Sequence, residues 1–202
     1  MILPIVVYGD PVLRKVGVTI DKHFEGLESL IANMFETTYN AKGVGLAAPQ
    51  VGKSIRLFIA DTSSFAEIDE EEEEEEQKMS KKEQEFLKNF KRVFINAKIL
   101  GEKGEGWKFN EGCLSIPKIR EDVERKSIIT IEYYDEHFKK QIETLDGLAA
   151  RVVQHEYDHI EGKLFTDRIS PFKRKILAGK LNDISNGKFS ADYMTKVYKG
   201  KR

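Results

Sequence analysis

The sequence predicts a single domain that mixes α-helices with β-strands, and three observations support this. The chain has 202 residues, of which 40% are hydrophobic and 10% aromatic, which suits one domain with a sizeable core. Apolar side chains recur at helical spacing over residues 24–41. Apolar runs at 55–60 and 92–96, with dense β-branched residues over 127–134, indicate strands.

The elements follow in order along the chain. The first helix places one apolar stripe at Leu27, Leu30, Ile31, Met34, Phe35 and Tyr39. A loop of small residues over 43–50 separates it from the first two strands. The third strand turns at 135–137 and returns through 141–144. Asp146 is expected to cap a helix that runs to about Glu161, with Gly162 just past its end, and Pro171 to begin a shorter helix that ends near Asn182.

Two segments differ from this pattern. Residues 63–91 are expected to form an acidic surface insertion, because Glu70 to Glu76 is an unbroken run that repels itself and resists burial. A short helix is expected over 80–90. The run could instead bind cations or a basic partner. The chain beyond Asn182 is polar, and we expect a loosely held basic tail over about 183–202.

Charge and cysteine content exclude several classes of function. The formal net charge of −1 predicts no general affinity for DNA or membranes. The one cysteine, Cys113, rules out an intramolecular disulfide and fits a reducing compartment. Neither a signal peptide nor a transmembrane stretch is apparent. We therefore expect a cytoplasmic protein.

A metal site is predicted by the sequence His155-Glu156-Tyr157-Asp158-His159. Residues four apart lie on one face of a helix, so both imidazoles can reach one ion. Leu148 and Val152 share that face. Glu156 lies one step round the helix, where its carboxylate can act on a water molecule as an acid or base. Two core histidines with other hydrogen-bond partners are the alternative.

Cys113 and Gln50 extend this prediction. A hydrolytic metal site needs a third ligand and an open position, and Cys113, in the sequence Glu111-Gly112-Cys113, can supply the ligand. A buried structural cysteine is the alternative. Gln50 ends the small-residue loop, and its amide can stabilise an oxyanion.

The segments GVGLAAPQ, EGCLS and HEYDH together resemble the three motifs of the peptide deformylase family, in the same order and without a mismatch. Similarity covers most of residues 1–180. The resemblance implies an α+β fold in which antiparallel sheets pack around a central helix that carries the HExxH motif, with a further C-terminal helix. It also implies hydrolysis of the N-formyl group from the formylmethionine of new polypeptides, with release of formate.

The resemblance implies roles for individual residues. The metal ligands would be Cys113, His155 and His159, with Glu156 as the catalytic carboxylate, and Gln50 and the Leu114 N–H as oxyanion donors. Glu111 resembles a buried acid that pairs with an arginine. The substrate would contact Val44, Gly45, Phe109, Gly112, Arg120, Leu148 and Val152.

The resemblance also implies cofactor and partners. One divalent ion is expected, Fe²⁺ in the cell, with Zn²⁺, Ni²⁺ or Co²⁺ able to replace it in a purified sample. The partner is an N-formylmethionyl peptide. Residues 173–202 hold nine Lys/Arg against Asp183 and Asp192, a balance of +7, which suits either transient ribosome contact or a solvated terminus.

Two other functions compete with this one. A zinc endopeptidase of the HExxH type would need a third histidine or acidic ligand downstream, but no histidine follows His159. A structural metal protein or an inactive relative would more readily have lost Glu156 or Gln50, and both are present.

Overall fold

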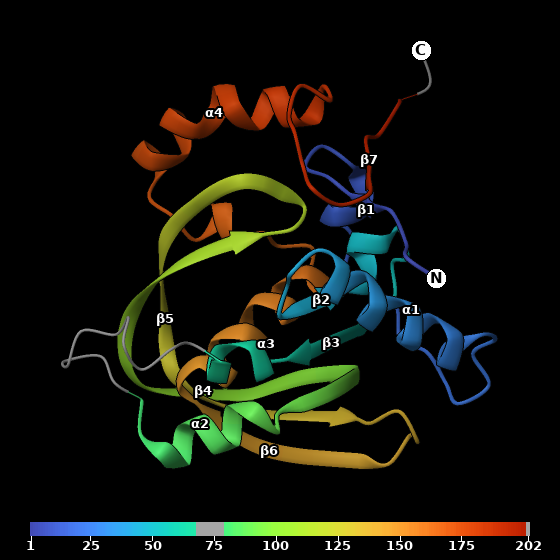
Figure 1. Ribbon diagram of the computed structural model, residues 1–202, viewed down its shortest axis with the longest axis vertical. Coiled ribbons are helices and arrows are strands. Elements are labelled where there is room, and N and C mark those ends of the chain that lie inside the picture. Colours follow the sequence, from blue (N-terminus) through green and yellow to red (C-terminus); the bar gives the residue numbers. More distant parts are fainter. Residues whose placement is uncertain (68–78, 201–202) are drawn as a thin grey trace.

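The computed structural model describes residues 1–67 and 79–200 (Figure 1). Its α-helices are α1 (Leu27–Asn40), α2 (Lys81–Lys88), α3 (Gly147–Ile160) and α4 (Pro171–Ser185). Its strands are β1 (Ile5–Val6), β2 (Gly45–Ala47), β3 (Leu57–Asp61), β4 (Lys91–Cys113), β5 (Ile116–Tyr134), β6 (Lys140–Asp146) and β7 (Thr195–Lys196). Short 3-10 turns are η1 (Pro11–Arg14), η2 (Ala48–Val51), η3 (Ser63–Glu67) and η5 (Phe165–Asp167).

The main sheet has the order β2-β3-β4-β5-β6, with every neighbouring pair antiparallel. The register between β4 and β5 shifts at several points, among them Ile95/Lys98, Ile99/Gly101 and Lys103/Gly106. Each irregularity bends a strand and increases its twist. The long hairpin therefore curves around α3, which lies inside the curve (Figure 1). The predicted α+β class, with antiparallel strands around a central helix, is confirmed.

The core under α3 is built on stacked aromatic rings. Phe94 is fully buried and lies between Phe58, at a centroid distance of 4.6 Å, and Tyr133, at 4.4 Å. Small side chains of α3, including Ala149 and Val153, complete the same cluster. These small side chains allow α3 to approach the sheet closely. The distance between the helix and the strands is thereby fixed, and with it the position of the polar side chains of α3.

The predicted helices are found, with differences at their ends. α1 begins at Leu27, after Gly26, whose φ of 74° belongs to the left-handed region. α3 begins at Gly147 as expected, but the Asp146 side chain makes no capping hydrogen bond. Gly162, at φ 68°, follows the end of α3. α2 confirms the helix predicted within 80–90, and Ser80 caps it by accepting from the Glu83 N–H at 3.2 Å.

The strands extend beyond the predicted runs. β4 and β5 are far longer than the predicted runs at 92–96 and 127–134. Residues 100–106 of β4 are exposed and consist mainly of glycine and charged residues, a composition that does not suggest a strand. The predicted loop over 43–50 contains β2 and η2. The strand predicted at 55–60 is β3, which starts at Leu57. Ile55 lies outside it and makes an isolated bridge to Val18.

The prediction of a loose chain beyond Asn182 is wrong. α4 continues to Ser185, and the chain then returns so that β7 pairs in parallel with β1, Thr195 opposite Ile5. This last segment is held by backbone hydrogen bonds to residues 5–7, which leave no periodic apolar pattern in the sequence. The acidic run Glu70 to Glu76 lies outside the described residues. Within 1–67 and 79–200, no helix has the length and apolar character needed to cross a membrane.

Replacing Phe94 by alanine should lower the free energy of unfolding by about 3–5 kcal/mol, because the removed ring leaves a cavity between Phe58 and Tyr133. The matched control is Phe172→Ala, whose ring is 74% exposed and whose loss should cost about 0.5 kcal/mol or less. Urea unfolding of the two variants measures the difference. Equal midpoints would show that the aromatic stack does not anchor the core.

Candidate active site

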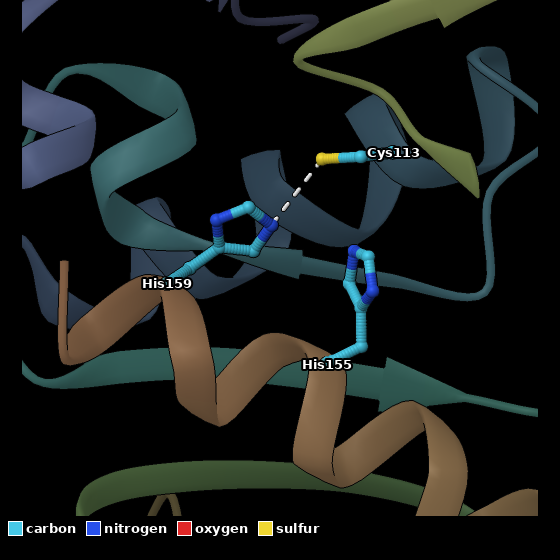
Figure 2. A group of neighbouring side chains, drawn as sticks. All are labelled: Cys113, His155 and His159. Carbon is cyan, nitrogen blue, oxygen red and sulfur yellow. Dashed lines mark hydrogen bonds between the residues drawn. The ribbon is translucent and has the colours of Figure 1, made fainter. Parts of the chain in front are cut away.

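The structure brings together the three residues predicted as metal ligands. His155 and His159 project from the last turns of α3, and Cys113 is the last residue of β4 (Figure 2). The Cys113 Sγ lies 3.3 Å from His159 Nε2, and one donor atom from each residue lies within 4.8 Å of the other two. Helical spacing aligns the histidines, and the β4–β5 hairpin carries the thiol to them.

This donor set fits a transition-metal ion. Two imidazoles and a thiolate are ligands that such ions favour, and three protein ligands leave a coordination position for water or substrate. His159 is buried, which lowers its pKa to about 3, so its ring is neutral and able to coordinate. The Glu156 Oε2 atom is buried without a hydrogen-bond partner among the described residues. Such an atom is rare inside a protein and fits a site that a ligand completes.

Glu111 orients His155 from behind. Its Oε2 atom lies 2.9 Å from His155 Nδ1, and its two oxygens also accept from Arg125 at 2.6 and 2.9 Å and from Arg151 at 2.9 Å. Burial opposes ionisation of Glu111, but the hydrogen bonds from Arg125 and His155 outweigh it and hold its pKa well below the ordinary value. An ionised carboxylate can only accept, so the proton of His155 sits on Nδ1. The opposite ring nitrogen, Nε2, is thereby left to face the ligand cluster.

Among the described residues, Glu156 makes no hydrogen bond to that charge network. The side chain is buried, and burial is the main reason why its pKa is raised to about 7. A carboxyl with this pKa can both accept and donate a proton near neutral pH. Gly45 packs against it, because a Cβ at position 45 would lie only 2.6 Å from Glu156 Oε1. A side chain at position 45 would therefore displace the Glu156 carboxyl.

The Gln50 amide is held in one orientation. Its Oε1 atom accepts from the Ala47 N–H at 2.8 Å, so Nε2 faces Cys113 Sγ at 3.6 Å and Ser115 Oγ at 3.3 Å. The Leu114 N–H follows Cys113 directly and donates to no acceptor within residues 1–67 and 79–200. Gln50 Nε2 thus lies beside the ligand cluster, and the backbone of Leu114 lines the same cleft.

A cleft of about 420 Å³ opens onto these groups. Its lining includes most of the residues predicted to contact substrate, namely Val44, Gly45, Phe109, Gly112, Arg120 and Val152. Apolar side chains form its inner wall, while the exposed Arg120 stands at its edge. The Arg120 guanidinium is already held by Asn110, whose Oδ1 accepts from Nε at 2.9 Å.

The structure does not bring Leu148 to this cleft. Leu148 packs against the buried cluster between α3 and the sheet. It lies seven residues before His155, and two helical turns separate the two side chains by about 10 Å along the axis. Leu148 and His155 therefore share a face of α3 but reach different places, the core and the cleft.

Several residues of the site were missed. Asp158, the fourth residue of the HEYDH segment, is buried and accepts from Arg125 at 2.7 Å and Arg168 at 2.6 Å. Its position on a buried helical face was the signal that could have revealed an ion pair. Phe65 and Tyr193 also line the cleft, from η3 and from the chain before β7. Neither has a sequence pattern that places it there.

Comparisons with known proteins agree with this geometry. Residues 2–175 match the family described as polypeptide deformylase. The chain is 58% identical to a peptide deformylase of Flavobacterium psychrophilum and covers all of both chains. Among solved structures, a peptide deformylase from Legionella pneumophila is 34% identical with a TM-score of 0.74, covering 93% of this chain and 98% of that one. The Thermotoga maritima peptide deformylase is 39% identical with a TM-score of 0.69, covering 85% and 99%.

Replacing Glu111 by glutamine should weaken metal binding by about 10–100-fold, because His155 loses its charged acceptor. The free energy of unfolding should fall by about 3–5 kcal/mol, because Arg125 and Arg151 lose a buried countercharge. Chelator competition and urea unfolding measure the two effects. Glu121→Gln is the control, since its partly exposed pair with Lys173 is worth about 1 kcal/mol or less. If the two variants behaved alike, Glu111 would have no special role.

Proposed function

Since this chain belongs to the polypeptide deformylase family and removes the N-formyl group from new polypeptides, we propose how its residues divide that reaction. Cys113, His155 and His159 hold one divalent metal ion, and Glu156 moves the proton. The main support is the convergence of the three donors within 4.8 Å of one another beside a buried carboxyl.

The family is metal-dependent, and the ion we propose for the cell is Fe²⁺. When bound, a divalent ion supplies Lewis acidity, which lowers the pKa of water and polarises the formyl oxygen. A thiolate beside two imidazoles suits ions of this type, and Zn²⁺, Ni²⁺ or Co²⁺ can take the same ligands. Ferrous ion next to a thiolate is prone to oxidation, so a sample purified in air can carry zinc.

Glu156 acts as base and then as acid. It takes a proton from the water that attacks the formyl carbon, and the C–N bond then breaks. It returns the proton to the departing amine, so that formate and a free methionyl amine are the products. A pKa of about 7 suits both transfers, because the carboxyl exchanges protons readily near neutral pH.

Gln50 and Leu114 stabilise the negative charge that develops on the formyl oxygen. Gln50 Nε2 and the Leu114 N–H are preorganised donors, which need no rearrangement when the charge forms. The fixed orientation of the Gln50 amide supports this role, since Oε1 is occupied by the Ala47 N–H.

The peptide lies extended in the cleft, between β2 and the end of β4. Gly45 and Gly112 allow its backbone to approach closely, and it adds to the sheet edge as a further strand. Val44, Phe109 and Val152 surround the methionine side chain, and Arg120 contacts the peptide at the rim. This assignment is supported by the cleft lining, which includes all of these residues. Leu148 is left out because it packs in the core.

Replacing Glu156 by alanine should lower kcat by at least about 100-fold, because the reaction loses its proton carrier. Formate release from formyl-Met-Ala-Ser, measured without oxygen after loading Fe²⁺ or Ni²⁺, tests this. The control is Glu136→Ala, which removes an exposed carboxyl from the turn before β6 and should leave kcat unchanged. Equal turnover of the wild type and the Glu156 variant would refute the mechanism.

We propose that the protein is cytoplasmic. We also propose that α4 contacts the ribosome transiently. Lys175 and Lys180 are exposed on α4, in a stretch that is rich in basic residues. Cations that pair with RNA phosphates release counterions, so binding weakens with salt. A C-terminal deletion is a poor test, because it also removes β7 and Tyr193.

The double variant Lys175→Glu/Lys180→Glu should bind ribosomes more weakly, with the slope of log K against log salt reduced by about 2. Co-sedimentation at several salt concentrations measures this slope. Peptide turnover should stay at the wild-type level, since both lysines lie outside the cleft lining. An unchanged slope would leave the ribosome contact without support.

A further inference from the structure

The C-terminal segment forms part of the cleft. After α4 the chain returns past the start of the sequence, where the Ile5 N–H donates to the Met194 carbonyl at 2.9 Å and the Val7 N–H to the Lys196 carbonyl at 3.2 Å. These bonds hold the segment that carries Tyr193. The Tyr193 ring packs against the cluster formed by α1 and the first strands, and one side of it lines the cleft with Cys113 and Leu114.

The Tyr193 hydroxyl has one defined contact, and it is with the catalytic turn. It donates to the Leu114 carbonyl at 2.7 Å, across 79 positions of sequence. Burial, followed by the charge of the nearby Cys113, raises the pKa of Tyr193 above its ordinary value. The phenol is therefore always protonated near neutral pH and always able to donate.

Leu114 and Ser115 form the tight turn between β4 and β5, and Cys113 pairs with Ile116 across it. Within the described part of the chain, two further hydrogen bonds from outside the turn restrain it, and Ser115 accepts both. Its carbonyl accepts from the Tyr8 N–H at 2.8 Å, and its hydroxyl accepts from Gln50 at 3.3 Å. Among the described residues, Tyr193 supplies the side-chain hydrogen bond to Leu114 itself.

We propose that Tyr193 is a positioning residue of the reaction, which holds the Leu114 carbonyl and thereby fixes the direction of the Leu114 N–H. The carbonyl and the N–H belong to two adjacent peptide planes that meet at the Leu114 Cα, within a two-residue turn closed by the Cys113–Ile116 pair. Because the ends of so short a turn are fixed, a shift of the carbonyl away from Tyr193 is shared with the neighbouring plane, which carries the N–H. This inference rests on the role proposed for Leu114. Tyr193 acts through Leu114, and the loss of its hydroxyl should affect the transition state more than the bound substrate.

The test is Tyr193→Phe in the full-length, metal-loaded enzyme, with formate release from formyl-Met-Ala-Ser as the assay. This change removes the hydroxyl and keeps the ring. We expect kcat to fall by about three- to ten-fold, as the loss of one neutral hydrogen bond would cause. KM and metal content should match those of the control Tyr198→Phe, whose ring is half exposed in the same segment. The thermal midpoint should fall by only about 2–4 °C, the loss expected for one hydrogen bond. Tyr193→Leu should also raise KM, because it removes the cleft wall.

The outcomes are distinct. If the wild type is active and Tyr193→Phe has the same kcat as Tyr198→Phe, the role of Tyr193 is overturned and the proposed function stands. A fall in kcat that follows lost metal, or that comes with partial unfolding at the assay temperature, would also overturn it, since the effect would then be structural. A wild type without turnover would overturn the proposed function, and the role of Tyr193 with it. A lower kcat at unchanged KM and metal content, with the variant fully folded at the assay temperature, supports the proposal.

Discussion

The site depends on one buried ionic contact, between Glu111 at the end of β4 and Arg125 of β5. Its separations of 2.6 and 2.9 Å, with both side chains at most 2% exposed, make it a bidentate pair inside the protein. Arg125 also binds Asp158, and Glu111 also accepts from His155, so the pair joins the sheet to α3 at two points. A buried charge that loses its partner is strongly unfavourable. The helix can therefore occupy only one position along the sheet, and that position sets the distance from its histidines to Cys113.

Support for the site comes from three separate parts of the chain, each of which fixes a different atom. The buried ionic network orients the His155 ring. The tight packing of Gly45 on the Glu156 carboxyl limits where that group can move, while its burial sets its pKa near 7. The β2–η2 segment holds the Gln50 amide through the Ala47 N–H. These restraints also act on one another, because the charges of Glu111, Arg125 and Asp158 contribute to the pKa of Glu156.

Sequence reasoning succeeded where a contact is local or repeats with a fixed period. The spacing of His155 and His159 is a property of any α-helix, so their shared direction was predictable. The position of Cys113 beside them required the motif resemblance, because 42 residues and a curved hairpin separate it from His155. Leu148, which the resemblance placed at the substrate, packs against the core instead; the helical phase it shares with His155 gives a direction around the axis but no distance along it. Tyr193 was not predictable, since a single hydrogen bond across the fold leaves no pattern in the sequence.

The pairing of β7 with β1 joins a segment that is synthesised early to one that is synthesised late. A ribosome builds the chain from its N-terminus, so the ligand residues and the Gln50 loop leave the exit tunnel well before residues 193–196 do. Among the described strands β1 pairs with β7 alone, so until then it is unpaired and the wall that Tyr193 supplies is missing. A nascent chain can thus hold all of its donor atoms while its cleft still lacks one side. The parallel pairing of β1 with β7 is therefore a late step in completing the cleft.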